Sequence, residues 1–332
     1  MRPHQTLEVK LGRWAGYPAE CVVACNSGSS ALLLALEALR LPAGAEVLTP
    51  DFSQIACARA VTLAGLTPVF IDCGDDLNLD PACVWDAMRP GTAAILAVHV
   101  YGRRCDMEAV EAASVRYGSD CRIIEDLAEA HGVRQHRTTD AACWSFHRSK
   151  LVHGEEGGAV AFRDPAHAAL ARSLRDMGFG PARDYMHAAG GWNHRLADLL
   201  ARPILRSLAT FPEEVARRRA VEALYEAACP AEWRMPPRQS PWTYDIRVPG
   251  MTYARQTAAV TALHAAGVTG ARHGFRPLAS QEEYQGSWVV GTGNAARLSP
   301  QTLYLPLAGG GTPATAAEAA RAFDVIRAAL LP

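Results

Sequence analysis

The sequence lacks the segments that direct a chain into a membrane or out of the cell, and it lacks a surplus of charge of either sign. No apolar run among its 332 residues reaches the roughly 18 residues that a membrane span needs. Met1–Lys10 has no apolar core, so no signal peptide is expected. The formal net charge of −1 argues against a nucleic-acid-binding protein, because such proteins carry a basic surplus. With 49% hydrophobic and 20% charged residues, the composition is typical of a packed globular protein.

Neither disulfides nor a bound metal is expected from the cysteine and histidine patterns. The nine cysteines form no CxxC pair, and most stand inside apolar runs, where cysteine behaves as a small hydrophobic residue. The eleven histidines show no ligand spacing such as HxxxH beside a carboxylate. We therefore expect a protein of the reducing cytoplasm, without a metal site.

The first half of the chain alternates short apolar runs with helical segments. The expected strands are 20–25, 46–49, 68–73, 93–100, 121–126, 141–146 and 158–162, and the expected helices are 31–41, 53–64, 81–88 and 107–117. Short apolar strands separated by helices indicate a mostly parallel sheet covered by helices on both faces. The expected fold class is therefore α/β.

The second half of the chain indicates a smaller α/β domain. The expected elements are helix 167–177, a helical stretch that opens at 192–195 and breaks at Pro203, helix 213–228, strand 243–248, helix 254–266, strand 303–305 and helix 313–331. A solvated helix face is the favoured interpretation of the three arginines Arg217–Arg219, and the proline-rich stretch 230–241 is expected to be an irregular crossover. We expect a large domain over 1–210 and a small domain over 211–332.

Four polar segments lie at or just after the ends of expected strands. They are Asn26–Ser30, Asp51–Gln54, Asp126–His131 and Ser145–Lys150. Because ligands of such sheets bind beyond the carboxyl ends of the strands, we expect these segments to share one cleft. The first segment also opens a helix, whose free N–H groups and dipole favour a phosphate. Ordinary N-capping by Ser27 or Ser29 is the alternative, and it is the better one for this turn taken alone.

A lysine and an aspartate in this cleft would supply the chemistry of a pyridoxal phosphate enzyme. Lys150 would form the Schiff base, and Asp126 would keep the pyridine nitrogen protonated. The phosphate would bind the backbone N–H groups of Gly28 and Ser29 and the hydroxyl of Ser145. Taken singly, the lysine is better explained as solvated surface and the aspartate as a helix cap. Phosphate turn, acid and lysine together, in this order, favour the cofactor.

With these residues the sequence resembles the DegT/StrS-type sugar aminotransferases, which are pyridoxal phosphate enzymes of the aspartate-aminotransferase fold (fold type I). The resemblance is specific from residue 7 to about residue 195 and looser beyond. It rests on SGSSALLLALEAL (27–39), VLTPDFSQIACARAVTLAGLTPVFID (47–72), VHVYGRRCDMEAV (98–110), IIEDLAEAHG (123–132), CWSFHRSK (143–150), GEEGGAV (154–160) and GGWNHRL (190–196).

The resemblance implies a role for each residue that matches a family motif. Lys150 resembles the lysine that binds the cofactor covalently and moves the proton in the reaction, and Asp126 resembles the partner of the pyridine nitrogen. Ala128 would pack on one face of the cofactor ring, and Glu129 would approach its phenolic oxygen. Asn193 would reach the phosphate bound by a neighbouring subunit, which implies a homodimer with shared active sites. Gly28, Ser29 and Ser145 resemble the phosphate cradle.

Departures from the family pattern bear on the substrate. Gln54 stands where the family stacks an aromatic ring on the second cofactor face, and the loss of that ring would weaken cofactor binding by about 1 kcal/mol. The N-terminus is also short, because the family normally has a further helix and loop before the match at Leu7–Trp14, and that loop helps to enclose the substrate. The loop Arg272–Leu278 resembles a family segment near the substrate, and its arginines meet either an anionic substrate group or solvent.

The resemblance thus implies an aminotransferase of sugar or antibiotic biosynthesis. It would move an amino group, with glutamate as the expected donor, onto a keto group of a sugar, a nucleotide-linked sugar or a sugar-like ring. The intact Lys150 favours transamination, because a histidine at this position marks the related deoxysugar dehydratases. Two alternatives stay open: dehydration or elimination on the same cofactor, which Gln54 and the short N-terminus motivate, and a non-catalytic cofactor-binding regulatory subunit.

Overall fold

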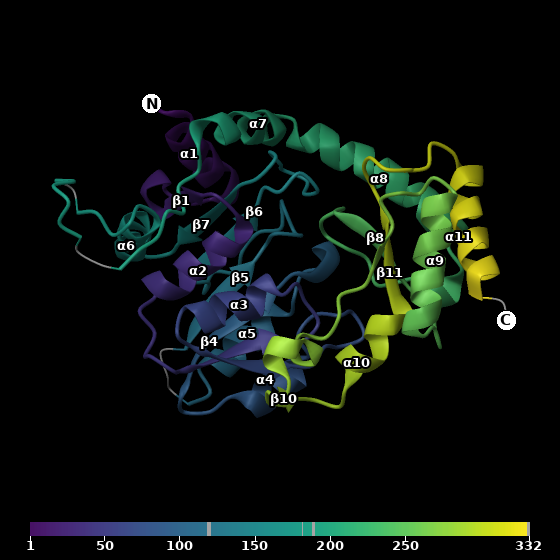
Figure 1. The fold of residues 1–332 in the computed structure, drawn as a ribbon, viewed down its shortest axis with the longest axis horizontal. Helices are drawn as coiled ribbons and strands as arrows, with labels where there is room; N and C mark the ends of the chain where they lie inside the picture. The colour runs from purple at the N-terminus through teal and green to yellow at the C-terminus, as the bar shows by residue number, and fades with distance from the viewer. Residues whose placement is uncertain (118–120, 181, 188–189, 331–332) are drawn as a thin grey trace.

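The computed structural model describes residues 1–117, 121–180, 182–187 and 190–330, which fold around two β-sheets (Figure 1). The strands are β1 (Val22–Cys25), β2 (Glu46–Pro50), β3 (Thr67–Ile71), β4 (Thr92–Val98), β5 (Arg122–Asp126), β6 (Ala141–Ser145), β7 (Gly158–Phe162), β8 (Thr243–Arg247), β9 (Arg272–His273), β10 (Val289–Val290) and β11 (Thr302–Pro306). The α-helices are α1 (Pro3–Ala15), α2 (Gly28–Ala38), α3 (Ala56–Leu63), α4 (Pro81–Ala87), α5 (Met107–Ser114), α6 (Pro165–Arg175), α7 (Asp198–Ala209), α8 (Phe211–Ala228), α9 (Tyr253–Ala265), α10 (Asn294–Leu298) and α11 (Ala316–Leu330).

The larger sheet has eight strands in the order β1-β7-β6-β5-β4-β2-β3-β10. Strand β7 runs antiparallel to both of its neighbours, and the other pairs are parallel. This confirms the expected α/β class with a mostly parallel sheet. Because β1, β5 and β6 run in the same direction, their carboxyl ends meet at one edge of the sheet, where the polar segments follow.

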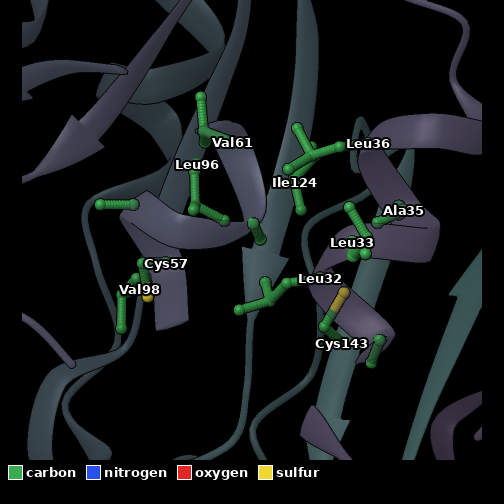
Figure 2. Close-up of a cluster of buried hydrophobic side chains, with 14 of the residues drawn as sticks. Leu32, Leu33, Ala35, Leu36, Cys57, Val61, Leu96, Val98, Ile124 and Cys143 are labelled. Carbon is green, nitrogen blue, oxygen red and sulfur yellow. The ribbon is translucent and has the colours of Figure 1, made fainter. Parts of the chain in front are cut away.

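Helices α2, α3 and α6 cover one face of this sheet. Helix α2 is apolar around most of its circumference, because it is enclosed by the sheet and by its two neighbouring helices. Figure 2 shows leucines of α2 and side chains of α3 pointing toward residues of β4, β5 and β6 in one buried cluster. The cluster fixes the position of α2, and thereby the position of the polar turn at its start.

The opposite face of the sheet is covered by α1 and α7 over one half and by α4 and α5 over the other. Leu7 and Leu11 of α1 pack with Ile204 and Leu208 of α7 against Val22 and neighbouring strand residues. Side chains along each strand point alternately to the two faces of the sheet, so Val23 packs on the face covered by α2 whereas Val22 packs on the face covered by α1.

The smaller sheet has the order β8-β11-β9 and is antiparallel. Helices α8, α9 and α11 pack on one face of it in a separate hydrophobic cluster that includes Tyr225, Tyr244 and Phe323 (Figure 1). Strand β10, from the same part of the sequence, instead pairs with β3 at the edge of the larger sheet. The expected domain boundary at residue 210 falls between α7 and α8.

Two expectations about local backbone structure were wrong. Residues 192–195 are not helical, because the backbone of this segment pairs with the end of β1: the Asn26 N–H donates to the carbonyl oxygen of His194 at 2.9 Å. Pro203 does not break its helix but lies inside α7. Burial of the flanking Ala201 and Ile204 against α1 offsets the cost of the missing backbone donor.

In the part of the chain that the structure describes, no helix combines the length and the apolar character needed to cross a membrane. All nine cysteines are free thiols. Within the described ranges, no three His, Cys, Asp or Glu side chains lie together as metal ligands would.

Candidate active site

The start of α2 packs closely against the ends of β6 and β7. Gly158 of β7 pairs with Cys25 on one side and Ser145 on the other, and a Cβ atom at Gly158 would overlap the carbonyl oxygen of Ser27. A Cβ atom at Gly28 would lie 2.7 Å from the Cβ atom of Ser145. The two glycines therefore bring the first N–H groups of the helix next to the Ser145 hydroxyl, which makes a cradle for an anion.

Helix capping and the anion cradle use different residues of this turn. The Ser27 hydroxyl accepts a hydrogen bond from the Ser30 N–H at 3.1 Å, so Ser27 is the N-cap. The Ser30 hydroxyl lies 3.1 Å from Nδ1 of His194, which ties the turn to the segment before α7. The capping alternative is thus confirmed for Ser27, and it leaves Gly28 and Ser29 facing the cradle.

Asp126, the last residue of β5, is a buried carboxylate. Its Oδ1 atom accepts a hydrogen bond from the Ala128 N–H at 2.9 Å, and the Cys57 thiol donates to Oδ2 at 3.6 Å. Burial raises the pKa of Asp126, although the nearby Lys150 opposes the effect. A buried acid of this kind is stabilised by a cation placed beside it, such as a protonated ring nitrogen.

Lys150 lies in the loop between β6 and β7, with its ammonium group turned into the protein. Its Nζ atom is 3.6 Å from Oε1 of Glu129 and 3.8 Å from the centroid of the Trp242 ring. Only 12% of its side chain is exposed, so it is not the solvated lysine that its sequence position alone suggests. An amino group held between an acid and an aromatic face is in position to react with a carbonyl group.

Burial shifts the pKa of two further groups next to the lysine. It raises the pKa of Glu129 to about 7, although Lys150 and the hydrogen bond from the Tyr101 N–H at 2.9 Å act in the other direction. Burial and the charge of Lys150 lower the pKa of His131 to about 3, so its ring is neutral. The neutral ring accepts a hydrogen bond at Nδ1 from the Val152 N–H at 2.9 Å and joins the loop after β5 to the lysine loop.

These groups line a cavity of about 390 Å³. Its described lining includes every predicted site residue except one: Gly28, Ser29, Gln54, Asp126, Ala128, Glu129, Ser145 and Lys150. The exception is Asn193, which is exposed and lies outside the cavity of its own chain. Gln54 is exposed at the rim, where its side-chain oxygen accepts a hydrogen bond from the Ala56 N–H at 2.5 Å.

Three aromatic side chains of the second half of the chain also line the cavity, and none of them was expected from the sequence. They are Trp242, Phe275 and Tyr304. Phe275 comes from the loop in which two arginines were considered as substrate contacts. Arg276 instead stacks on the ring of Tyr253, 3.4 Å from its centroid, and Arg272 donates to the carbonyl oxygens of Thr269 and Ala271.

One signal in the sequence would have strengthened the assignment of the lysine. The chain contains only two lysines, Lys10 and Lys150, among 33 basic residues. In a chain that otherwise uses arginine as its cation, a lysine in a polar segment after a strand stands out. Lysine differs from arginine in that it can lose its proton and act as a nucleophile.

The cavity fits pyridoxal phosphate. The close approach of Gly28 to Ser145 provides a site for the phosphate, Asp126 provides a buried negative charge for the ring nitrogen, and Lys150 provides the amino group. Ala128 and Glu129 line the same cavity, Ala128 hydrogen-bonded to the acid and Glu129 beside the lysine.

Comparisons with known proteins extend over most of the chain. A sequence model of the DegT/DnrJ/EryC1/StrS aminotransferase family matches residues 2–323. The GDP-perosamine synthase of Caulobacter vibrioides is 37% identical over 210 residues, which cover 61% of this chain and 56% of the synthase, less than two thirds of its length. The UDP-N-acetyl-3-dehydro-alpha-D-glucosamine 3-aminotransferase of Acidithiobacillus ferrooxidans is 34% identical over 297 residues, 86% of this chain and 78% of that protein. The crystal structure of S. venezuelae DesV in complex with a ketimine intermediate has a TM-score of 0.84 and 28% identity, and the match covers 100% of this chain and 90% of DesV.

Proposed function

The chain belongs to the DegT/DnrJ/EryC1/StrS aminotransferase family, and from this premise we propose that it is a pyridoxal-phosphate-dependent aminotransferase. It takes an amino group from glutamate and transfers it to a keto group of a sugar, a nucleotide-linked sugar or a sugar-like ring. The observation that carries the proposal is that Lys150, Asp126 and the start of α2 all line the same cavity. The names of the two relatives, a perosamine synthase and an aminotransferase of a UDP-linked amino sugar, support this class of acceptor.

The residues of the cavity have distinct tasks in this reaction. Pyridoxal phosphate supplies a conjugated ring that takes up the electron pair released at the substrate carbon. Gly28, Ser29 and Ser145 hold its phosphate, and the carboxylate of Asp126 holds the proton on its ring nitrogen. Lys150 would hold the cofactor through Nζ, and the same atom, once the amino group of a substrate has displaced it from the cofactor, would accept and return the proton of the substrate carbon.

The first test is spectroscopic. Purified protein incubated with pyridoxal phosphate should show the visible absorbance band of a lysine-bound cofactor, and Lys150→Ala should abolish that band. Lys10→Ala is the matched control, because Lys10 is the other lysine of the chain and is exposed on α1. Absence of the band in the wild-type protein, or its persistence in Lys150→Ala, would end the proposal.

Glutamate alone distinguishes the proposed reaction from the alternatives. An aminotransferase completes its first half-reaction without an acceptor, so 2-oxoglutarate should appear and the visible band should disappear. An enzyme of dehydration or elimination, or a non-catalytic subunit, would retain the band and release no 2-oxoglutarate. A panel of keto sugars, with and without a linked nucleotide, then identifies the acceptor from the return of the band.

We further propose that the protein acts as a homodimer in which Asn193 completes the phosphate site of the neighbouring subunit. The exposed position of Asn193 outside its own cavity supports this arrangement. Lys150→Ala and Asn193→Ala subunits, each impaired alone, should recover about a quarter of wild-type activity when mixed, because a mixed dimer has one intact site. No recovery on mixing would show that each chain builds its own site.

A cytoplasmic location and the division of the chain at residue 210 also remain proposals. The nine free cysteines support a reducing compartment, where thiols persist. The separate hydrophobic cluster around β8 and β11 supports a distinct C-terminal unit.

A further inference from the structure

Arg218 of α8 is a buried cation that contacts the lysine loop. Its side chain is 4% exposed, whereas that of the adjacent Arg217 is 49% exposed, so the solvated face expected for this arginine triplet was wrong at its central residue. The Nε atom donates to Oε1 of Glu214 at 2.6 Å, Nη1 donates to the carbonyl oxygen of Trp242 at 2.9 Å, and Nη2 donates to the carbonyl oxygen of Lys150 at 3.4 Å. One guanidinium thus joins the backbone of the lysine to the backbone of the tryptophan.

Trp242 is also bound to the lysine loop through its own side chain. The indole Nε1–H donates to the carbonyl oxygen of Ser149 at 2.9 Å. The ring stacks on Tyr101 at a centroid distance of 6.1 Å and an interplanar angle of 24°, and its face lies 3.8 Å from Nζ of Lys150. The indole is therefore a fixed wall against which the lysine ammonium rests.

The backbone before Trp242 is anchored to the loops of the larger sheet. The N–H groups of Gln239 and Ser240 both donate to the carbonyl oxygen of Gly102 at 3.0 Å, and the Ser240 hydroxyl donates to the carbonyl oxygen of His131 at 2.8 Å. A side chain at Gly102 would overlap the backbone of Ser240. The proline-rich crossover therefore forms one wall of the active site and is not a loose linker between the two sheets.

We propose that Arg218 and Trp242 are positioning residues that hold Lys150 within reach of the cofactor. The proposal rests on the function proposed above, because it concerns the reactive lysine of that site. Arg218 acts through the carbonyl oxygens of Lys150 and Trp242, and Trp242 acts through its ring face and its bond to Ser149. Neither side chain takes part in the chemistry itself. Together they determine the position of the Lys150 Nζ atom while it is not bonded to the cofactor.

The test separates attachment of the cofactor from occupation of its site. Pyridoxal phosphate added to the cofactor-free protein reports the rate at which the visible band grows, which requires Lys150. Pyridoxamine phosphate fills the same site but forms no bond to the lysine, so its affinity reports the site alone. In Arg218→Met we expect the band to grow about ten- to a hundredfold more slowly, as for other small displacements of a reacting group, with unchanged affinity for pyridoxamine phosphate.

Neighbouring and conservative variants make the result specific. Arg217→Met should behave as wild type, because Arg217 pairs only with Glu214 among the described residues. Arg218→Lys should recover part of the rate, since an ammonium can still donate to a carbonyl oxygen. Trp242→Phe retains a ring face and should be faster than Trp242→Leu, and these variants decide the question if Arg218→Met does not fold.

Two outcomes would overturn the proposal. The first is that the cofactor attaches equally fast in Arg218→Met and Arg217→Met. The second is that Arg218→Met loses attachment rate and affinity for pyridoxamine phosphate to the same extent, which would indicate general damage to the site. Both differ from failure of the proposed function, in which the wild-type protein itself forms no band.

Discussion

Glu129 lies where burial and a neighbouring cation act on one carboxyl group in opposite directions. Its folded-state pKa is about 7, against an ordinary value of 4.5, so burial outweighs the attraction of Lys150. Between these two pH values the folded protein holds a proton that the unfolded chain has released. The contribution of Glu129 to stability is therefore fully present below about pH 4.5 and is lost as the pH rises through about 7.

Replacement of Glu129 by glutamine should remove this dependence in the cofactor-free protein. The free energy of unfolding of the wild type should fall more steeply between about pH 4.5 and 7 than that of Glu129→Gln, with a difference on the order of 1 to 3 kcal/mol over the window. Urea unfolding across this pH range measures it. Glu156→Gln is the control, because Glu156 lines the same cavity but is exposed. Parallel pH profiles for Glu129→Gln and wild type would contradict the assigned pKa.

Single residues were predictable where they belong to a local sequence pattern. The turn at Gly28 and the lysine at Lys150 follow strands, the acid Asp126 ends one, and parallel strands bring their carboxyl ends together. Trp242 follows no such pattern, because its place depends on the path of an irregular crossover. Arg218 could not be told from its neighbours, since three consecutive residues of a helix point in three directions and their sequence does not show which one faces inward.

At the scale of elements, the close packing of the start of α2 against β6 and β7 requires glycine at two positions, Gly28 and Gly158. Gly28→Ala would place a methyl group 2.7 Å from the Cβ atom of Ser145 and would push the helix start away from β6.

We therefore expect Gly28→Ala to weaken the binding of pyridoxal phosphate by about tenfold or more, because a charge-assisted phosphate contact is worth roughly 1.5 to 3 kcal/mol. Titration of the visible band measures the affinity. Gly91→Ala is the matched control, since a Cβ atom at that glycine meets no atom within 4 Å in the described part of the chain. Equal cofactor affinity of the two variants would show that the start of α2 can move away from Ser145 without weakening cofactor binding.

The order of strands and helices from β1 to β7 was also predictable, because apolar runs alternate with helical segments in that part of the chain, whereas α1 was not among the expected elements. Expectations failed where tertiary contacts outweigh local preference. Pro203 is tolerated in α7 because the helix is packed along α1, and residues 192–195 are extended because β1 offers them a backbone partner.

At the scale of the whole molecule, buried ion pairs connect the two sheets. Asp245 of β8 accepts two hydrogen bonds from Arg103, at 2.9 and 2.6 Å, and one from Arg238 at 3.1 Å. Arg238 also donates to Glu222 of α8 at 2.6 Å. Burial alone would raise the pKa of Asp245, but the two arginines hold it below the ordinary value. One carboxylate thus joins a loop of the larger sheet to the smaller sheet.

Removal of that charge should destabilise the protein strongly. Asp245→Asn leaves two buried arginines facing each other, and the loss of a buried partner costs about 3 to 5 kcal/mol. Asp75→Asn, which breaks an ion pair with Arg247 at a side chain that is 75% exposed, should cost no more than about 1 kcal/mol. Chemical denaturation measures both free energies of unfolding. A loss in Asp245→Asn as small as that in Asp75→Asn would show that this contact does not hold the two sheets together.

The pairing of β10 with β3 has a consequence for how the chain is made. Val289 lies beside Phe70, so the edge partner of β3 leaves the ribosome long after β3 itself. Until then β3 presents an unpaired edge, which is a site for wrong pairing between chains. A nascent chain that stops before Val289 carries the complete set of cofactor-binding side chains of the first half but not the strand that closes its sheet. The larger sheet is therefore complete only after residues 289–290 have been synthesised.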